Sequence, residues 1–137
     1  MKVKSLTVLA LAVGVLLVTV PLLAHHGNSA FDTGKRLTLK GTVTEWFWAN
    51  PHCFLKFDVK DDSGAVVNWV AETTNGPDMM ERGWSKQSFK AGDEVTVTVR
   101  PVKSGRPVGS IIQVQFADGH VLSAVGGGGN EPTPARP

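Results

Sequence analysis

The chain has 137 residues, which is enough for one small domain with a single core. Its formal charge of +2 comes from 14 basic and 12 acidic residues. Two of the basic residues, Lys2 and Lys4, precede an apolar run, and without them 14 − 2 = 12 basic residues balance the 12 acidic ones. The rest of the chain therefore lacks the positive excess of a nucleic-acid-binding protein. The single cysteine, Cys53, excludes an intrachain disulfide and a cysteine-based metal cluster.

Residues 1–24 have the pattern of a secretory signal peptide. Two lysines precede the uncharged apolar run 6–23, and the small residue Ala24 ends the segment. An uncleaved membrane anchor is the alternative, because the run approaches the roughly 18 apolar residues that can span a bilayer. Pro21 weakens such a span. We therefore expect an exported protein of a bacterial periplasm, whose only link to a membrane would be an uncleaved signal segment.

The sequence after residue 24 predicts three segments. We expect an extended N-terminal leader over residues 25–35, a β-domain over residues 36–123 and a disordered Gly/Pro-rich tail over residues 124–137. Alternating apolar and polar residues predict strands within the β-domain, and they occur at 36–45, 53–60, 66–72, 95–100 and 112–116, with a short return at 120–122.

A short helix interrupts the strands. Asn75-Gly76-Pro77-Asp78 is a typical helix start, and Gly83 can end the helix. Three strands, a short helix and two more strands follow the order of an OB-fold. The predicted fold class is therefore all-β with one short helix, as a small OB-like five-stranded Greek-key barrel; an open β-sandwich fragment is the alternative. The side chains expected to form its core are Leu39, Val43, Leu55, Phe57, Val97, Val99, Val114 and Phe116.

Signal cleavage after Ala24 would leave His25 as the first residue, followed by His26. An N-terminal histidine offers its α-amine and its imidazole to one metal ion, and nitrogen ligands of this kind suit copper. His52, His26 or His120 would complete the ligand set. The alternative is an ordinary polar leader, and cleavage after Ala30 would remove both N-terminal histidines.

Asn50-Pro51-His52 lies between the first two predicted strands, on a loop that OB-folds use for binding. The proline restricts the residue before it and holds the loop in a defined direction. As a metal ligand, His52 would be a neutral imidazole that needs a second hydrogen-bond partner, either Asn50 or a backbone carbonyl. The alternative is that His52 only braces the loop.

Aromatic residues follow the first predicted strand. In a regular strand, Trp46 and Trp48 would continue its polar face and, with Phe54 and His52, form an aromatic surface for a small ligand or an envelope protein. A β-bulge at Glu45–Phe47 would instead turn both tryptophans into the core. The sequence leaves both arrangements open.

Catalytic patterns are weak. His52 and Cys53 are neighbours on a strand, so their side chains diverge and a Cys–His nucleophilic pair is not expected. Glu72 and Glu81 are acidic residues of the kind that bind metals, but positions on a strand rim and a helix surface explain them equally well. We therefore assign no catalytic residue.

The motifs together resemble a domain-of-unknown-function family of small exported bacterial proteins. The resemblance covers nearly the whole chain after the signal segment, and it rests on His25-His26, Phe31-Asp32, Leu39-Lys40-Gly41-Thr42-Val43, Asn50-Pro51-His52, Trp69, Glu72, Arg82-Gly83-Trp84, Gly92-Asp93-Glu94-Val95 and Ala117-Asp118-Gly119. It implies an exported OB-like domain and assigns no activity.

Three functional hypotheses follow. The first is a periplasmic binding or accessory protein without catalytic activity, which binds copper or a similar metal through His25 with His52, His26 or His120. The second is a metal-free protein-interaction module of the cell envelope, whose surface consists of Trp46, Trp48, Asn50 and Phe54. The third is a copper-dependent oxidase.

Overall fold

In a computed structural model, the structure describes residues 28–126. The chain divides into two units, Met1–Ala30 and Phe31–Pro137, and the β-domain belongs to the second. Among the described residues, no helix is long and apolar enough to cross a membrane. The histidines His25 and His26, the predicted signal segment and most of the predicted tail lie outside the described residues.

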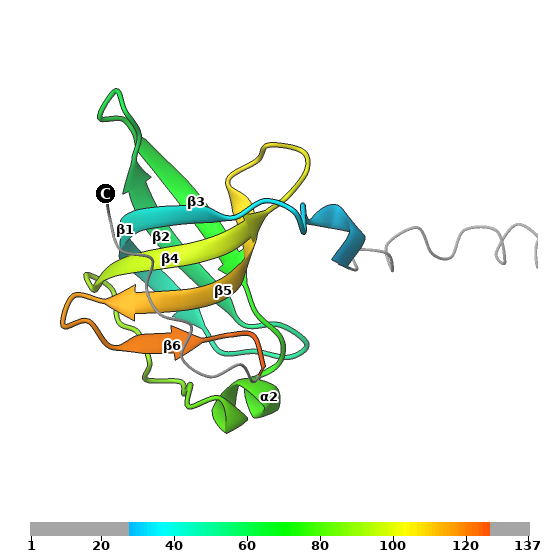
Figure 1. Cartoon of the computed structure of the whole chain (residues 1–137). Helices are drawn as coiled ribbons and strands as arrows, with labels where there is room; N and C mark the ends of the chain where they lie inside the picture. The colour runs from blue at the N-terminus through cyan, green and yellow to red at the C-terminus, as the bar shows by residue number, and fades with distance from the viewer. Residues whose placement is uncertain (1–27, 127–137) are drawn as a thin grey trace, which may run out of the picture. The chain divides into compact units, whose positions relative to one another are not determined.

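Strands dominate the described part of the chain (Figure 1). Its elements are η1 (Asn28–Ala30), β1 (Leu37–Phe47), β2 (Phe54–Lys60), β3 (Val66–Glu72), α2 (Gly76–Glu81), β4 (Glu94–Pro101), β5 (Val108–Phe116) and β6 (Val121–Ser123).

Five of the strands close into a barrel. β1 pairs antiparallel with both β2 and β4, β2 pairs with β3, and β4 pairs with β5. A parallel pairing of β3 with β5, at Val70↔Val108 to Glu72↔Ser110, completes the ring β1-β2-β3-β5-β4. The short β6 lies outside this ring and pairs with the second half of β5. The predicted OB-like barrel with one short helix is confirmed.

β1 serves two ladders because it bends in its middle. Its first half pairs with β4 as far as Thr42↔Glu94, and its second half pairs with β2 from Thr42↔Asp58 onward. Gly41 lies at the bend, where an added Cβ would approach the carbonyl oxygen of Asp58 to 2.5 Å and the ring of Phe57 to 3.0 Å. Only glycine lets the two backbones come this close.

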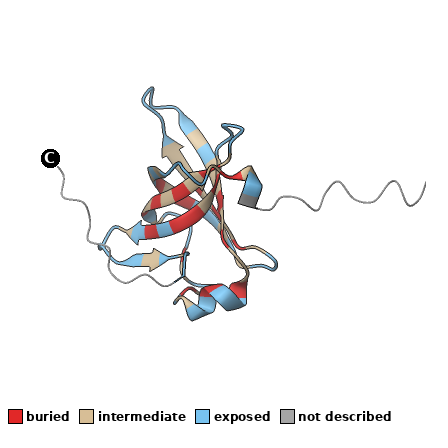
Figure 2. Ribbon diagram, turned by 45° about the vertical axis from the view of Figure 1, so that its right-hand side comes forward, coloured by how far each residue is buried: buried red, intermediate tan, exposed pale blue. Residues whose placement is uncertain are grey.

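The core consists of the inward faces of the strands, and Figure 2 shows the buried residues along them. Six of the eight side chains predicted for the core are at most 1% exposed: Val43, Leu55, Phe57, Val97, Val99 and Val114. The other two, Leu39 and Phe116, are half-buried and pack against this cluster. The inward register predicted for these strands is therefore correct.

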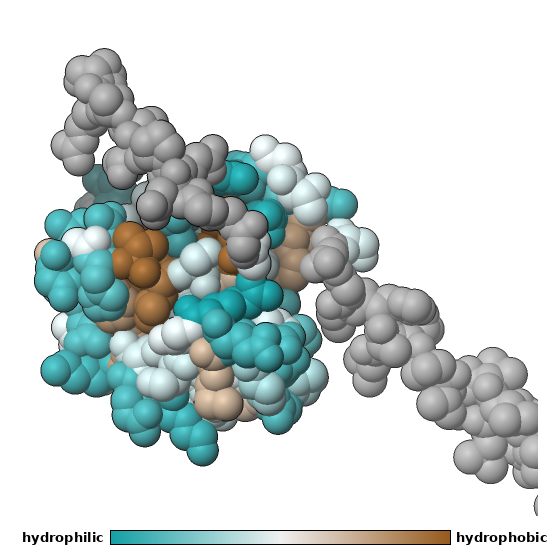
Figure 3. All heavy atoms as spheres, turned by 60° about the horizontal axis from the view of Figure 1, so that its bottom comes forward, coloured by the Kyte–Doolittle hydropathy of each residue, from teal (hydrophilic) through white to brown (hydrophobic). Residues whose placement is uncertain are grey.

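The segment between β3 and β4 adds the helix and further core side chains. The Asn75 side chain accepts a hydrogen bond from the backbone N–H of Asp78 at 2.9 Å and so caps α2. Met79 is fully buried, and Trp84 is 2% exposed, with its Nε1 donating to the carbonyl of Ser123 at 2.8 Å. The helix and Trp84 thus belong to the same core as the strands. Viewed with this end forward, the surface is mostly hydrophilic with separate hydrophobic areas (Figure 3).

The segment predicted as an extended leader is partly attached to the barrel. Phe31 is 8% exposed and forms a β-bridge with Val102, and the backbone N–H of Asp32 donates to Pro101 at 2.8 Å. The barrel unit therefore begins at Phe31, five residues before the predicted start, because the apolar Phe31 side chain is buried there.

Replacing Phe57 with alanine should lower the free energy of unfolding by about 3–5 kcal/mol, because it removes a fully buried ring and leaves a cavity. Urea denaturation measures the change, with Val66→Ala as the control, because Val66 is 55% exposed. Equal unfolding midpoints for the parent and Phe57→Ala would contradict the inward register of β2.

Candidate functional site

A β-bulge in β1 determines which side chains surround the candidate site. Val43 pairs with Phe57, but the next pair is Glu45 with Lys56, so Thr44 has no partner on β2. One extra residue reverses the facing of every residue that follows it in a strand. Beyond Thr44, the tryptophans therefore lie on the core side and Phe47 lies outside.

Trp46 and Trp48 belong to an aromatic cluster at the core. The Trp46 ring lies 5.1 Å from Phe89 in an edge-to-face arrangement, and its Nε1 donates to the carbonyl of Ser85 at 3.0 Å. The Trp48 ring lies 5.9 Å from Trp46 and covers Gly76, where an added Cβ would lie 2.8 Å from the indole nitrogen. A bulge therefore turns both tryptophans toward the core, as in the second arrangement, but it lies between Val43 and Glu45 and not at Glu45–Phe47. The aromatic surface expected from a regular strand is not formed by these tryptophans.

Other residues occupy the outer face at this place. Phe47 is 41% exposed and pairs across the strands with Phe54. The Nζ of Lys56 lies 4.7 Å from the centre of the Phe47 ring and 2.9 Å from a carboxylate oxygen of Glu45. The His52 ring lies 6.3 Å from Phe54. Phe47 and Lys56 could not be identified from the sequence, because the face on which they lie depends on the bulge.

One ring nitrogen of His52 forms a hydrogen bond, and the other forms none within residues 28–126. His52 follows the cis peptide Asn50–Pro51, and its Nδ1 lies 2.9 Å from the carbonyl oxygen of Thr73. A carbonyl oxygen only accepts hydrogen bonds, so Nδ1 carries the hydrogen, and in the neutral ring Nε2 keeps its lone pair. The predicted second partner of His52 is thus a backbone carbonyl and not Asn50. A histidine that binds a metal is oriented in this way by a hydrogen bond at its other nitrogen.

Cys53 connects the loop that carries His52 to the end of β3. Its side chain is fully buried, with Sγ 3.5 Å from the carbonyl of Ala49. Its backbone N–H donates to Thr74 at 3.2 Å, and its carbonyl accepts from Thr73 at 2.9 Å. These bonds join the His52 loop to the end of β3 and hold the Thr73 carbonyl in place. The thiol faces the core, so no Cys–His pair is formed with His52.

His120 forms a separate local structure in the turn after β5. Its Nδ1 lies 2.7 Å from a carboxylate oxygen of Asp118, and its ring stacks on Phe116 at 4.0 Å. The Asp118 carboxylate accepts hydrogen bonds from the backbone N–H of His120 and from the His120 ring. These hydrogen bonds, the backbone one first, hold the pKa of Asp118 below the ordinary aspartate value.

The structure does not bring His120 to His52. His52 lies next to Phe54, which pairs with Glu72, and Glu72 pairs in turn with Ser110 near the start of β5. His120 follows the other end of that strand. The intervening residues of β5 span about 20 Å at 3.3 Å per residue. His120 is thus not a partner for His52 within this barrel.

The acidic candidates have ordinary positions. Glu72 ends β3 and is half-buried, and Glu81 ends α2 and is exposed. Over residues 28–126, no group of three or more histidine, cysteine, aspartate or glutamate side chains comes together as a metal site.

The neutral His52 ring should carry its hydrogen on Nδ1. Nitrogen-15 NMR of the imidazole, about two pH units above the ordinary histidine pKa of about 6.5, distinguishes the two tautomers. His120 is the positive control, because its Nδ1 bonds a carboxylate, which also only accepts hydrogen bonds and so places the hydrogen on the same nitrogen. A neutral His52 with its hydrogen on Nε2 would contradict the Thr73 contact.

Comparison with known proteins gives one match. The model of a family of unknown function, DUF6152, matches residues 12–115. No curated protein and no solved structure matches the chain. Because the match covers more than half of the 137 residues, the chain belongs to this family of unknown function, DUF6152.

Proposed function

We propose that this protein is an exported, periplasmic accessory protein that binds copper through a mature N-terminal His25 together with His52, and that it catalyses no reaction. The observation that carries the proposal is the hydrogen bond between His52 Nδ1 and the Thr73 carbonyl. It orients the ring and leaves Nε2 as the metal-binding atom. The leader sequence supplies the other ligands, the amine and imidazole of His25 and the imidazole of His26.

Chain geometry is compatible with this ligand set. Phe31 is bridged to Val102, whose backbone N–H donates to Val108 at 3.0 Å. Val108 pairs with Val70, three residues before Thr73. The attachment point of the leader and the carbonyl that holds His52 therefore lie at neighbouring strand ends. Six residue steps separate His25 from Phe31 and would span about 22 Å if fully extended, and the 3-10 turn at Asn28–Ala30 shortens this reach. The shortened reach still covers a few strand spacings of about 4.8 Å.

The charge of the proposed site also suits copper. The N-terminal ligands and His52 all offer nitrogen atoms, which copper prefers over hard oxygen donors. The surface beside His52 is balanced, because the Lys56 ammonium is paired with Glu45 at 2.9 Å. The positive charge of Lys56 is therefore offset by Glu45 and repels an approaching cation less.

The direct test is copper titration of protein purified from the periplasm with its native N-terminus, followed by calorimetry and electron paramagnetic resonance. His25→Ala and His52→Ala should each weaken copper binding at least about tenfold, the scale for loss of even a supporting group at a metal site. His120→Ala is the matched control and should leave the affinity unchanged. Equal affinities for the parent and His52→Ala would remove His52 from the site.

A chemical modification isolates the amine. Selective acetylation of the α-amine of His25 converts it into an amide, keeps the imidazole and adds no new amine, so copper binding should weaken as it does in His25→Ala. If the acetylated protein bound copper as tightly as the native one, the amine would not be a ligand, and the two histidines would form an ordinary polar leader.

Copper occupancy should also fall as the pH drops from about 7 to about 5. Protons compete for the imidazoles and the amine, whose ordinary pKa values are about 6.5 and about 7.7–8.0. Metal content after dialysis at each pH measures the fall. Constant occupancy over this range would point to ligands other than histidine and the N-terminal amine.

A metal-free interaction module is the second candidate, and the exposed Phe47 beside Phe54 favours it. Under this hypothesis, Phe47→Ser should weaken binding of a purified envelope partner, while His52→Ala should leave it unchanged.

A further inference from the structure

β1 and β2 separate like the prongs of a fork at the bend of β1. Their ladder ends at the pair Thr42↔Asp58. Beyond it, β1 pairs only with β4, as at Lys40↔Thr96, and β2 pairs only with β3, as far as Lys60↔Val66. The backbones touch at the apex of the fork, where Gly41 leaves no room for a Cβ beside Asp58.

An open groove of about 650 Å³ occupies this fork. Four charged and two apolar side chains line it: Lys40, Lys60, Asp58, Glu94, Val59 and Val66. The volume lies within the roughly 300–1,000 Å³ of sites for small molecules. The groove lies at the far end of β2 from His52, because Phe54 begins that strand and Lys60 ends it. It is therefore separate from the proposed copper site.

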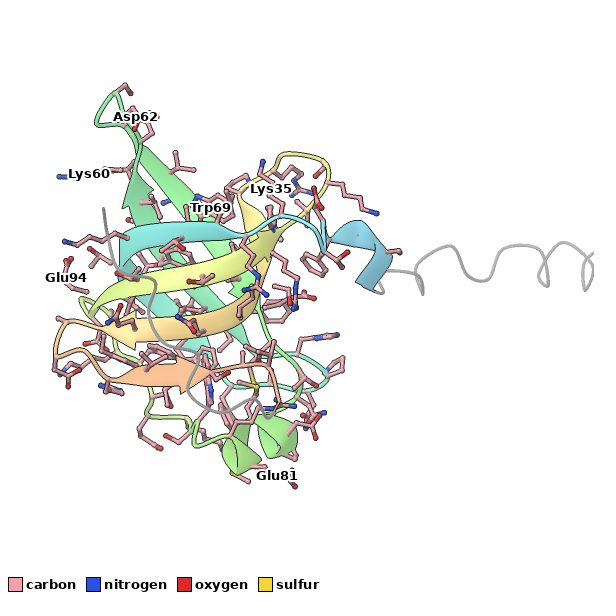
Figure 4. The ribbon with its side chains drawn as sticks, in the orientation of Figure 1. Lys35, Lys60, Asp62, Trp69, Glu81 and Glu94 are labelled. Carbon is pink, nitrogen blue, oxygen red and sulfur yellow. The ribbon has the colours of Figure 1, made fainter. Side chains whose placement is uncertain are left out.

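Two lysines stand on the prongs of the fork. Lys40 belongs to β1 and Lys60 to β2, and in the described part of the chain neither forms an ion pair or a side-chain hydrogen bond. Figure 4 shows Lys60 projecting from the same side of the barrel as Glu94. Both side chains are exposed and line the same groove, so an anionic group placed between the two ammonium groups is attracted by both.

Two carboxylates stand at the apex. Thr42 pairs with Glu94 on one side and with Asp58 on the other, so the three residues form one row across three strands. Glu94 accepts a hydrogen bond from the Thr42 hydroxyl at 2.9 Å, and Asp58 accepts one from the Asn68 amide. These bonds position both carboxylates and leave most of their acceptor sites open. The groove is thus negative at its apex and positive at its prongs.

Its remaining wall is apolar. Val66 is 55% exposed, and Val59 is half-buried and packs against the core. We propose that the fork binds a small zwitterion with an apolar side chain, such as a short peptide. Its ammonium group lies near Asp58 and Glu94, its carboxylate lies between Lys40 and Lys60, and its apolar side chain lies on Val66.

Three matched probes test this proposal at about pH 6.5, where a peptide amine with a pKa of about 7.7–8.0 is charged. Leucyl-leucine has both charges, its N-acetyl form lacks the ammonium, and its amide lacks the carboxylate. Followed by protein NMR titration, leucyl-leucine should bind with a millimolar Kd and shift the amide signals of Thr42 and Val66. Each capped form should bind at least about threefold more weakly.

Two variants assign the charges. Lys60→Gln should weaken the binding of leucyl-leucine at least about threefold and leave the binding of the amide form unchanged, because the amide form has no carboxylate that the lysine could contact. Glu94→Gln should weaken the binding of leucyl-leucine and leave the binding of the N-acetyl form unchanged, because that form has no ammonium group. Lys86→Gln, at an exposed lysine outside the groove, is the control, and thermal unfolding checks that each variant folds.

Three outcomes would overturn the proposal. One is the absence of shifts at the fork with leucyl-leucine, and another is equal binding of the three probes. The third is that Lys60→Gln weakens binding of the amide form as much as binding of leucyl-leucine, which would show that the lysine does not contact the carboxylate. Copper binding is measured on the same variants and should not change, so failure of one site is distinguishable from failure of the other.

Discussion

The bulge at Thr44 is the constraint on which the candidate site of this barrel depends. Before it, Val43 points into the core opposite Phe57; after it, Trp46 points into the core opposite Leu55. A regular strand would put both tryptophans in water and Phe47 inside. The bulge thus packs the two tryptophan rings against the core, where they are half-buried, and exposes Phe47. It also sets the direction in which β1 enters the loop that carries His52.

The two halves of β1 lie next to the two candidate sites. Its second half ends next to the His52 loop, which the backbone bonds of Cys53 tie to the end of β3. Its first half turns away from β2 at Gly41 and opens the fork. The seven residues of β2 connect the two places and are fully paired with β3, which makes them a rigid spacer. A binding loop and a groove on a closed barrel therefore lie at fixed positions.

Much of the fold could be predicted from the sequence, because its strands alternate cleanly and Asn75-Gly76-Pro77 marks the helix start. The facing of residues 45–48 could not, since Thr44 is a β-branched residue that suits a regular strand as well as a bulge. For the site, the loop of His52 was predictable from its proline. Its bond to Thr73 was not, because the partner lies 21 residues away and depends on how β2 pairs with β3. The fork was missed for a similar reason, since the lysines on its prongs meet only through the closed ring of strands.

The most direct measurement of the central claim, that a bulge at Thr44 sets the two faces of β1, is the cross-strand register in solution. Nuclear Overhauser contacts between the backbones of β1 and β2 distinguish the two arrangements without any substitution. The bulged strand predicts contacts of Trp46 with Leu55 and of Phe47 with Phe54, together with contacts from the Trp46 indole to Phe89. Contacts of Thr44 with Lys56 and of Trp46 with Phe54, the pairs of an unbulged ladder continued from Val43↔Phe57, would contradict it.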